Sequence, residues 1–484
     1  MNRRVIAFFM AGSLLAGSGG TYAGMQWFYH SQKEAGLEPK AGLEGKEDPG
    51  SGAPEELGKV GQAYELILGS YVEKVEGEQL AEGAIQGMLS TLDDPYSVYM
   101  NEETARQFNE TLESSFEGIG AEVSMVDGKV IIVSPFKDSP AEKAGLKPND
   151  QILKVDGESV EGLDLYEATL KIRGEKGTNV MLEIRRQGLQ EPLSVKVKRD
   201  EIPQITVYAE MKEENDKRIG HIEITTFSED TAKEFTRELK KLEKEGLDGL
   251  IIDVRGNPGG LLSSVEEILK GLVTKEKPYV QIQKRNGDKT RYFSELDKEK
   301  GYPVAVLIDK GSASASEILA GALEEGAGYP LIGEATFGKG TVQQPVPMGD
   351  GSNIKLTLFK WLTPDGNWIH RKGIKPTIEV VQPEIFHTHP LNMEKPLMLD
   401  MNNEQVKNAQ IMLDGLGLSP GRKDGYFSEA TETAVKAFQQ HQGLEATGKV
   451  DSKTAAALEQ AIIAETKKEE NDIQLQAAIR YLSR

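Results

Sequence analysis

The sequence predicts an α/β chain that carries a small β-rich insertion and ends in a small helical domain. Apolar strand-like runs alternate with amphipathic helical segments from about residue 201 onward, a pattern typical of parallel strands covered by helices. Short β-like runs, separated by Gly, Pro, Asp and Asn turns, lie between residues 130 and 197. Helical-period segments follow residue 402. With 484 residues, the chain is long enough for two to four domains.

Composition excludes some classes of function. The formal net charge of −20 argues against a nucleic-acid partner, because phosphate binding needs a basic surface. The absence of cysteine excludes disulfides and thiolate metal sites, and it suits an extracytoplasmic bacterial protein. We expect neither a metal nor another cofactor.

Residues 1–30 are predicted to direct export. Arg3 and Arg4 precede an apolar stretch, and small residues follow it as far as Ala23. A signal peptide cleaved near Ala23 is one interpretation. An uncleaved anchor is the other, and we prefer it, because residues 5–29 carry no charge and are long enough to span a bilayer. On either interpretation the protein is extracytoplasmic, whether secreted or membrane-anchored.

Residues 31–54 and 55–102 differ in composition. The first range is rich in Gly, Pro, Glu and Lys, and it predicts a flexible linker. The second has a helical period, with one apolar stripe through Tyr64 and another through Met88. Two short amphipathic helices cannot bury their apolar faces alone, so they must pack on each other, on the rest of the chain or on a second subunit.

Residues 103–200 contain an ordered series of motifs. They are Gly118-Ile119-Gly120, Ser139-Pro140-Ala141, Ala144-Gly145-Leu146 and Asp156-Gly157. This order resembles a PDZ domain, and it implies that Gly118, Ile119 and Gly120 form the carboxylate-binding loop. Consecutive N–H groups of a glycine-rich turn can hold a peptide C-terminal carboxylate while the peptide adds to a strand edge.

Arg173 follows the predicted helix of this PDZ-like domain. Our hypothesis is that Arg173 reports peptide occupancy to the rest of the protein by pairing with a carboxylate or a polar backbone group. An ordinary surface arginine is the alternative.

A glycine-rich turn follows a predicted buried strand within residues 201–390. The strand spans residues 250–254, and the turn is Gly256-Asn257-Pro258-Gly259-Gly260. Glycines between a strand and a helix leave backbone N–H groups accessible, which suits one half of an oxyanion hole. A tight turn that needs glycine conformations is the alternative.

Residues 311–318, with the sequence GSASASEI, lie between an apolar strand-like run and a helical segment. This places Ser312, Ser314 and Ser316 at a strand-to-helix junction, where free N–H groups favour negative charge. A nucleophile whose attack creates an oxyanion belongs at such a point. The alternative is that the three serines are only helix N-caps.

Residues 333–341 nearly match the phosphate-binding pattern G-x-x-x-x-G-K-[ST]. Two observations contradict nucleotide binding. Gly340 occupies the position of the metal-binding hydroxyl, and the residues that follow are β-like and include Pro345, whereas a phosphate site needs a helix there. We therefore expect no nucleotide site.

Four motifs occur in order along the chain: the PDZ-like insertion, GNPGG, GSASASEI and FGKGTVQ. Together they resemble the carboxy-terminal processing proteases of the S41 serine peptidase family over about residues 57–381. The resemblance implies a crotonase-like core in which Ser314 is the nucleophile, Lys339 the general base and Gln343 the group that orients the lysine. The oxyanion hole that it implies comprises the backbone N–H groups of Ala315 and of Gly259 or Gly260.

A lysine base agrees with the chemistry of this predicted site. A free lysine has a pKa of about 10.4, so about one in a thousand is neutral near pH 7.4, and burial lowers that pKa by several units. We expect Gly338 and Gly340 to allow close backbone approach, and Phe337 and Val342 to exclude water from Lys339. An exposed loop lysine is the alternative. None of the 6 histidines lies beside a nucleophile motif in the sequence.

The end of the chain predicts two further units. Residues 391–464 contain DGYFSEATETAVKAFQQHQGL and TGKVDSKTAAAL, which resemble the small helical peptidoglycan-binding module. Glycan binding and dimer contact both stay open as its function. Residues 465–484 predict a final amphipathic helix whose apolar face needs a partner surface, for which a second subunit is one candidate. We expect the protein to form a homodimer.

Two hypotheses for function follow. In the first, the protein is a serine endopeptidase that recognises protein C-termini through its PDZ domain and cleaves by acyl transfer. Its resemblance to sporulation-associated members of the family implies a regulatory protease that cuts an extracytoplasmic segment of a membrane protein. Its partners are then a polypeptide with an accessible C-terminus and, as a further candidate, peptidoglycan. In the second, the protein is a non-catalytic scaffold or binding protein of the cell wall.

Overall fold

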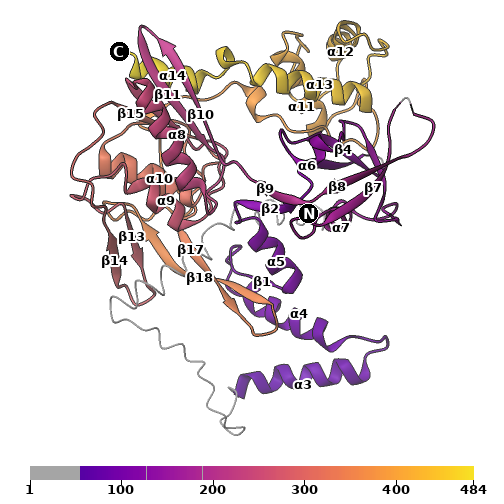
Figure 1. Ribbon diagram of the computed structural model, residues 1–484, viewed down its shortest axis with the longest axis horizontal. Coiled ribbons are helices and arrows are strands. Elements are labelled where there is room, and N and C mark those ends of the chain that lie inside the picture. Colours follow the sequence, from indigo (N-terminus) through magenta and orange to yellow (C-terminus); the bar gives the residue numbers. More distant parts are fainter. Residues whose placement is uncertain (1–54, 127, 188) are drawn as a thin grey trace.

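The computed structural model describes residues 55–126, 128–187 and 189–484 (Figure 1). The predicted export segment, residues 1–30, and the predicted linker, residues 31–54, lie outside the described residues. Within the described ranges, no helix is both long enough and apolar enough to cross a membrane.

A six-stranded sheet lies at the centre of the α/β core. Its strands, in spatial order, are β10 (Val207–Glu214), β11 (Lys217–Ile224), β12 (Gly249–Asp253), β15 (Val304–Ile308), β16 (Leu331–Gly333) and β19 (Ile378–Glu379). β10 pairs antiparallel with β11, and the later pairs are parallel. Every residue of β12 and β15 is buried, because both faces of these parallel strands are covered. The α/β fold class predicted from the sequence is confirmed.

Different helices cover the two faces of this sheet. They are α8 (Thr231–Glu245), α9 (Leu262–Leu269) and α10 (Ala315–Gly321) on one face and α14 (Ile473–Leu482) on the other. Alternate strand residues serve the two faces, so Ile252 packs under α8 and α9 while Ile251 packs against Leu475 and Ile479 of α14. The sequence predicts that this last helix needs a partner surface, with a second subunit as one candidate. The partner surface is instead the second apolar face of the chain's own sheet.

An antiparallel sheet lies beside the α/β core. Its strands are β1 (Val98–Met100), β18 (Asn353–Leu362), β13 (Val280–Gln283) and β14 (Lys289–Tyr292) in that order, with β17 (Thr341–Pro347) also paired to β18. β17 begins directly after Gly340, so the segment that resembles a phosphate-binding loop leads into a strand and not into a helix. The loop that carries Lys339 therefore joins the two sheets.

The β-rich insertion has its own hydrophobic core. Its elements are β3 (Ala121–Val126), β4 (Lys129–Pro135), α6 (Pro140–Lys143), β5 (Gln151–Val155), β6 (Glu158–Ser159), α7 (Leu165–Ile172), β7 (Asn179–Arg185) and β8 (Leu193–Lys198). Asp164 begins α7 with a capping box that also uses Glu167. β2 (Ser115–Gly118) pairs antiparallel with β9 (Asp200–Pro203), so the two ends of the insertion leave the α/β core side by side.

Other helical segments lie near both ends of the described chain and directly after α10. They are α3 (Glu55–Ser70), α4 (Gly77–Ser90) and α5 (Glu102–Glu110) at the start, η1 (Ala322–Gly326) directly after α10, and η2 (Glu384–His387), α11 (Glu404–Gly415), α12 (Glu429–His441), α13 (Ser452–Thr466) and η3 (Glu469–Asn471) near the end. The C-terminal helices α11, α12 and α13 enclose a separate core, far from α3 and α4 (Figure 1). α3 and α4 contact each other but leave Val60, Leu66 and Met88 exposed.

Glu266 on α9 is a buried carboxyl inside the main core, with 3% of its surface exposed. Burial raises its pKa to about 8 from an ordinary 4.5, and the Tyr279 hydroxyl lies 3.5 Å from its Oε1. The folded chain therefore binds more protons than the unfolded chain between pH 4.5 and 8, so the free energy of unfolding falls as pH rises through that window.

We expect Glu266→Gln to remove this decline and to raise the free energy of unfolding at pH 9 by a few kcal/mol. Urea unfolding at pH 5 and pH 9 measures the difference. The exposed neighbour Glu267 provides the control, because Glu267→Gln should keep the wild-type dependence on pH. The same decline in Glu266→Gln and in wild type would contradict the expectation.

Candidate active site

The three serines of the strand-to-helix junction have different roles in the structure. Ser312 Oγ donates to Val254 O at 2.8 Å, and Ser316 Oγ donates to Asn257 O at 2.9 Å, so both hydroxyls hold buried backbone. Ser314, at the start of α10, is partly exposed and has φ 55° and ψ −112°. A residue other than glycine rarely adopts this conformation, and such strain collects at functional sites. Ser314 is thus the one serine of the three that is not fully buried.

Lys339 is buried, with 2% of its surface exposed. Its Nζ lies 4.9 Å from the centroid of the Tyr96 ring, and Trp361 Nε1 donates to its backbone carbonyl at 2.8 Å. Burial, followed by the positive charge of Lys355, lowers the pKa of Lys339 to about 7, against an opposing effect of Glu317. A substantial fraction of this amine is therefore uncharged at neutral pH.

The residues that shield Lys339 are only partly those expected from the sequence. Val342 lines the cavity at the lysine, as expected. Phe337 was expected to exclude water, but 51% of its surface is exposed. Instead, Tyr96, which lies before β1, packs against the Lys339 amine, and Trp361 of β18 donates to the Lys339 backbone carbonyl.

One small cavity of about 20 Å³ brings the predicted catalytic residues together. Its lining comprises Gly260, Leu262, Ser314, Ala315, Ile318, Lys339, Thr341, Val342, Gln343 and Trp361. Its volume is of the order of a single water molecule. The serine, the lysine, the glutamine and two of the three predicted oxyanion residues thus line one small cavity.

Gln343 is buried on β17 and has a fixed amide group. Its Nε2 donates to Thr341 Oγ1 at 3.0 Å and to Thr357 Oγ1 at 3.1 Å. These two bonds engage both amide protons, and the carbonyl oxygen Oε1 can only accept a hydrogen bond.

The glycine turn contributes Gly260 to the lining of the cavity. A side chain at Gly259 would place its Cβ 2.9 Å from Ser314 Cβ, and one at Gly260 would place it 2.1 Å from Phe227 O. Both positions have positive φ, 107° and 147°, so the turn requires glycine twice. Gly259 N–H donates to Asn257 Oδ1 at 2.8 Å. Gly260 N–H makes no hydrogen bond within the described ranges, and it is therefore the freer donor of the pair.

The predicted carboxylate-binding loop lies in the insertion and does not line the cavity of Ser314. Ile119 is buried, and its carbonyl accepts from Ala141 N–H at 2.8 Å, next to the start of α6. Gly120 has φ 72°, and a Cβ there would meet Ser139 Cβ at 2.6 Å. Gly118 ends β2 and lies against Arg173, whose Cγ would be 3.7 Å from an added Cβ.

Arg173 connects the insertion to helix α5. Its Nη1 lies 2.7 Å from Glu110 Oε2, and its guanidinium stands 4.8 Å from the centroid of the Phe116 ring. Two residues before Glu110, Phe108 packs in a cluster with Leu261, which directly follows Gly260. A chain of contacts thus runs from the insertion to the glycine turn.

Two charged residues at this site escaped the sequence analysis. Glu317 is fully buried, and its carboxylate accepts from three backbone N–H groups and one hydroxyl. Its signal in the sequence was a lone acid among small and apolar helix residues, three positions after Ser314. Lys355 on β18 is 2% exposed, and burial lowers its pKa to about 8. Nothing local in the sequence distinguishes Lys355 from an exposed strand lysine.

Comparisons with known families match four parts of the chain. The model for peptidase family S41 matches residues 218–380, and a PDZ domain model matches residues 118–197. A putative peptidoglycan-binding domain model matches residues 402–458, and the model for the N-terminal domain of the activating protease CtpB matches residues 14–104.

Similar proteins match most or all of the chain. The carboxy-terminal processing protease CtpB of Bacillus subtilis is 56% identical over 482 residues, which cover 100% of this chain and 99% of that protein. The carboxy-terminal processing protease CtpA of the same organism is 45% identical over 88% of this chain and 90% of its own length. Among solved structures, the photosystem II D1 C-terminal processing protease matches with 26% identity and a TM-score of 0.41, over 68% of this chain and 94% of that one.

Proposed function

The chain belongs to the carboxy-terminal processing proteases of peptidase family S41, and we propose that Ser314 and Lys339 form its catalytic dyad. One observation carries the proposal: the partly exposed serine and a buried lysine line the same cavity of about 20 Å³. Burial holds the pKa of Lys339 at about 7, so the amine can accept a proton at neutral pH. An activated hydroxyl beside a neutral amine suits acyl transfer.

Acylation follows from this arrangement. Neutral Lys339 accepts the proton of Ser314 Oγ as that oxygen attacks the carbonyl carbon of the scissile peptide bond. The carbonyl oxygen gains the negative charge, which the N–H groups of Gly260 and Ala315 stabilise. The C–N bond then breaks, Lys339 returns the proton to the leaving amine, and an ester on Ser314 remains.

Deacylation reverses the roles. Lys339 accepts a proton from a water molecule whose oxygen attacks the ester carbon, and the Ser314–acyl bond breaks as the proton passes to Ser314 Oγ. Gln343 orients the lysine through Oε1, and its hydrogen bonds to Thr341 and Thr357 support this role.

We also propose that the PDZ domain selects the substrate by its C-terminus. Gly118, Ile119 and Gly120 would hold the terminal carboxylate, because a glycine-rich turn offers consecutive N–H groups. Arg173 would report occupancy to the catalytic core. Its ion pair with Glu110 supports this role, because α5 also packs on the residue next to Gly260.

Cleavage of one polypeptide with two different C-termini tests the function. We expect wild type to cleave an unstructured polypeptide that ends in a free apolar residue, and kcat/KM to fall at least about tenfold when the same terminus is an amide. Ser314→Ala should leave no detectable cleavage of either form. Cleavage by Ser314→Ala would contradict the dyad, and equal rates on both termini would contradict recognition of the carboxylate.

The cellular setting is part of the same proposal. We place the protein outside the cytoplasm, secreted or anchored, as a regulatory protease that cuts a membrane-protein segment during sporulation signalling. The 56% identity to the Bacillus subtilis carboxy-terminal processing protease CtpB supports the protease activity, and the apolar stretch after Arg3 and Arg4 supports export. A homodimer is supported by the exposed apolar side chains of α3, such as Val60 and Leu66. The match of residues 402–458 to a peptidoglycan-binding model supports peptidoglycan as a second partner.

A further inference from the structure

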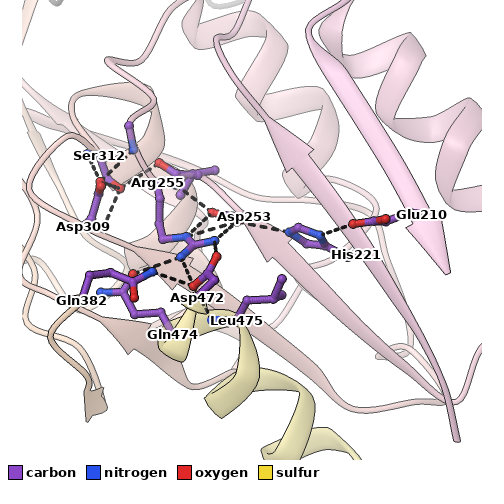
Figure 2. A network of polar contacts seen from close by, with 12 residues as sticks. Glu210, His221, Asp253, Arg255, Asp309, Ser312, Gln382, Asp472, Gln474 and Leu475 are labelled. Carbon is purple, nitrogen blue, oxygen red and sulfur yellow. Dashed lines mark hydrogen bonds and ion pairs between the residues drawn. The ribbon is translucent and has the colours of Figure 1, made fainter. Parts of the chain in front are cut away.

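The C-terminal segment of the chain reaches Arg255, the residue that precedes the glycine turn (Figure 2). Arg255 Nη1 donates to Asp472 Oδ1 and Arg255 Nη2 to Asp472 Oδ2, each at 2.8 Å. Nη1 also lies 3.2 Å from Gln474 Oε1, and Nε and Nη2 bind the carboxylate of Asp253 at 2.7 to 3.2 Å. The guanidinium of Arg255 is thus held between the end of β12 and residues that lie 217 and 219 positions further along the chain.

Asp472 is itself a fixed anchor and not part of a loose tail. It caps α14 by accepting from Leu475 N–H at 2.9 Å, and it accepts from Gln382 Nε2 at 2.6 Å. The apolar face of α14 is buried on the central sheet. The carboxylate therefore has little freedom to move relative to the sheet.

Hydrogen bonds hold three residues of the turn that follows Arg255. Gly256 N–H donates to Asp309 Oδ1 at 2.8 Å, and Asn257 Nδ2 donates to Ile224 O at 2.7 Å. Further along, Gly259 O accepts from Phe227 N–H at 2.9 Å. The bidentate pair of Arg255 with Asp472 adds a charge-assisted contact at the entrance of the turn, with the directional geometry of two parallel hydrogen bonds.

We infer that Asp472 is a positioning residue for the peptidase reaction, and that it acts through Arg255 on the glycine turn that carries Gly260 N–H. The inference rests on the proposed function, in which that N–H stabilises the oxyanion. The C-terminal helix is then a structural part of the active site, although it contributes no group to the cavity.

The physical reason lies in the demands of the oxyanion hole. Its donors must stand about 2.7 to 3.1 Å from the position of the charged oxygen, and displacements of about 0.5 Å already cost much of the effect. Glycines impose few conformational limits of their own, so the Gly256–Gly260 turn depends on its contacts for a single geometry. The stabilisation concerns the transition state and not the bound substrate, so its loss should appear in kcat.

Asp472→Asn in the full-length chain is the test. Asparagine keeps the size of the side chain and one oxygen for the cap, but it removes the negative charge and presents an NH₂ group to the N–H groups of Arg255. We expect kcat on the free-C-terminus polypeptide to fall at least about tenfold, with KM within about twofold of wild type. The rate at which a fluorophosphonate reacts with Ser314 should fall by a similar factor, because that reaction also places a charged oxygen in the oxyanion hole.

Glu469→Gln is the matched control. It removes an ion pair of the same segment, but Glu469 contacts Lys212 and not Arg255. We expect its kcat and labelling rate to stay at the wild-type values. Unchanged kcat in Asp472→Asn would overturn the inference, and so would equal losses in both variants, because these would indicate general docking of the segment. Either result leaves the dyad standing if Ser314→Ala is inactive, whereas cleavage by Ser314→Ala would reject the proposed function itself.

Discussion

Replacing Lys339 by methionine is expected to lower kcat by roughly 10³-fold or more, because the variant lacks the amine that we propose as the acceptor of the Ser314 proton. Methionine keeps an unbranched apolar chain in a site where the lysine is 2% exposed, so the cavity stays filled. Steady-state cleavage of the free-C-terminus polypeptide measures the loss. Activity of Lys339→Met near that of wild type would contradict the dyad.

The pH profile provides a second measurement on the same residue. Burial and the charge of Lys355 lower the pKa of Lys339 to about 7, and in the proposed mechanism only the neutral amine acts as a base. We therefore expect kcat/KM of wild type to rise with pH through about 7 and then to level off. Lys355→Met removes a neighbouring positive charge, so it should raise the pKa of Lys339 and shift the acid limb to higher pH.

The stability of Lys339→Met distinguishes lost chemistry from lost folding. The pKa of Lys339 is lower in the folded chain, about 7 against 10.5, so between these pH values the unfolded chain binds more protons and the free energy of unfolding rises with pH. At pH 7 the folded chain therefore bears most of the free-energy cost of keeping the buried amine uncharged. Removing the amine should therefore leave the urea midpoint at pH 7 equal to or above that of wild type.

The motifs of the candidate active site could be recognised in the sequence because each reflects a local backbone requirement. The positive φ of Gly259 and its close approach to Ser314 exclude a side chain there. An added Cβ at Gly338 would lie 2.9 Å from Gly373 N, and one at Gly340 would lie 2.8 Å from His370 N. Such constraints place glycines at fixed positions in the sequence, where the motifs can be recognised. The alternation of strand-like and helical segments predicted the α/β fold class.

The surroundings of the motifs could not be predicted, because they come from distant parts of the chain. Phe337, next to Lys339 in sequence, is exposed, whereas Tyr96 and Trp361 cover the amine and its backbone. Lys355 is buried under Phe108 of α5, at 5.1 Å from the ring centroid. Hydrophobic periodicity identifies an amphipathic helix but not the surface that covers it. For that reason the helix α14 was predicted and its position on the chain's own sheet was not.

Glu317 connects the two halves of the proposed dyad, and Glu317→Gln is expected to reduce kcat at least about 100-fold. Oε2 accepts from Ser314 N–H at 2.9 Å and from Lys339 N–H at 2.8 Å. Oε1 accepts from Gly338 N–H at 2.7 Å and from Thr336 Oγ1 at 2.6 Å. Burial raises the pKa of Glu317, and these four hydrogen bonds oppose the rise. Because all four partners are donors, both oxygens of the Glu317 side chain must accept.

Glutamine cannot satisfy this arrangement in either orientation of its amide. Its NH₂ group would face two donors, either Ser314 N–H and Lys339 N–H or Gly338 N–H and Thr336 Oγ1. The serine junction and the lysine loop would then separate or leave buried donors unpaired. We expect the free energy of unfolding to fall by about 2 to 4 kcal/mol, as for other buried polar groups that lose their partner.

The pH profile separates positioning from electrostatics in this variant. The carboxylate of Glu317 raises the pKa of Lys339, so an effect through charge alone would lower that pKa, move the acid limb to lower pH and keep the plateau rate. Positioning predicts a lower plateau at every pH. Glu324 provides the control, because it lies just beyond α10 and bonds Thr377 Oγ1 at 3.2 Å without contact to either loop. Glu324→Gln should cleave as wild type does, and a Glu317→Gln plateau equal to that of wild type would contradict the role of this carboxylate.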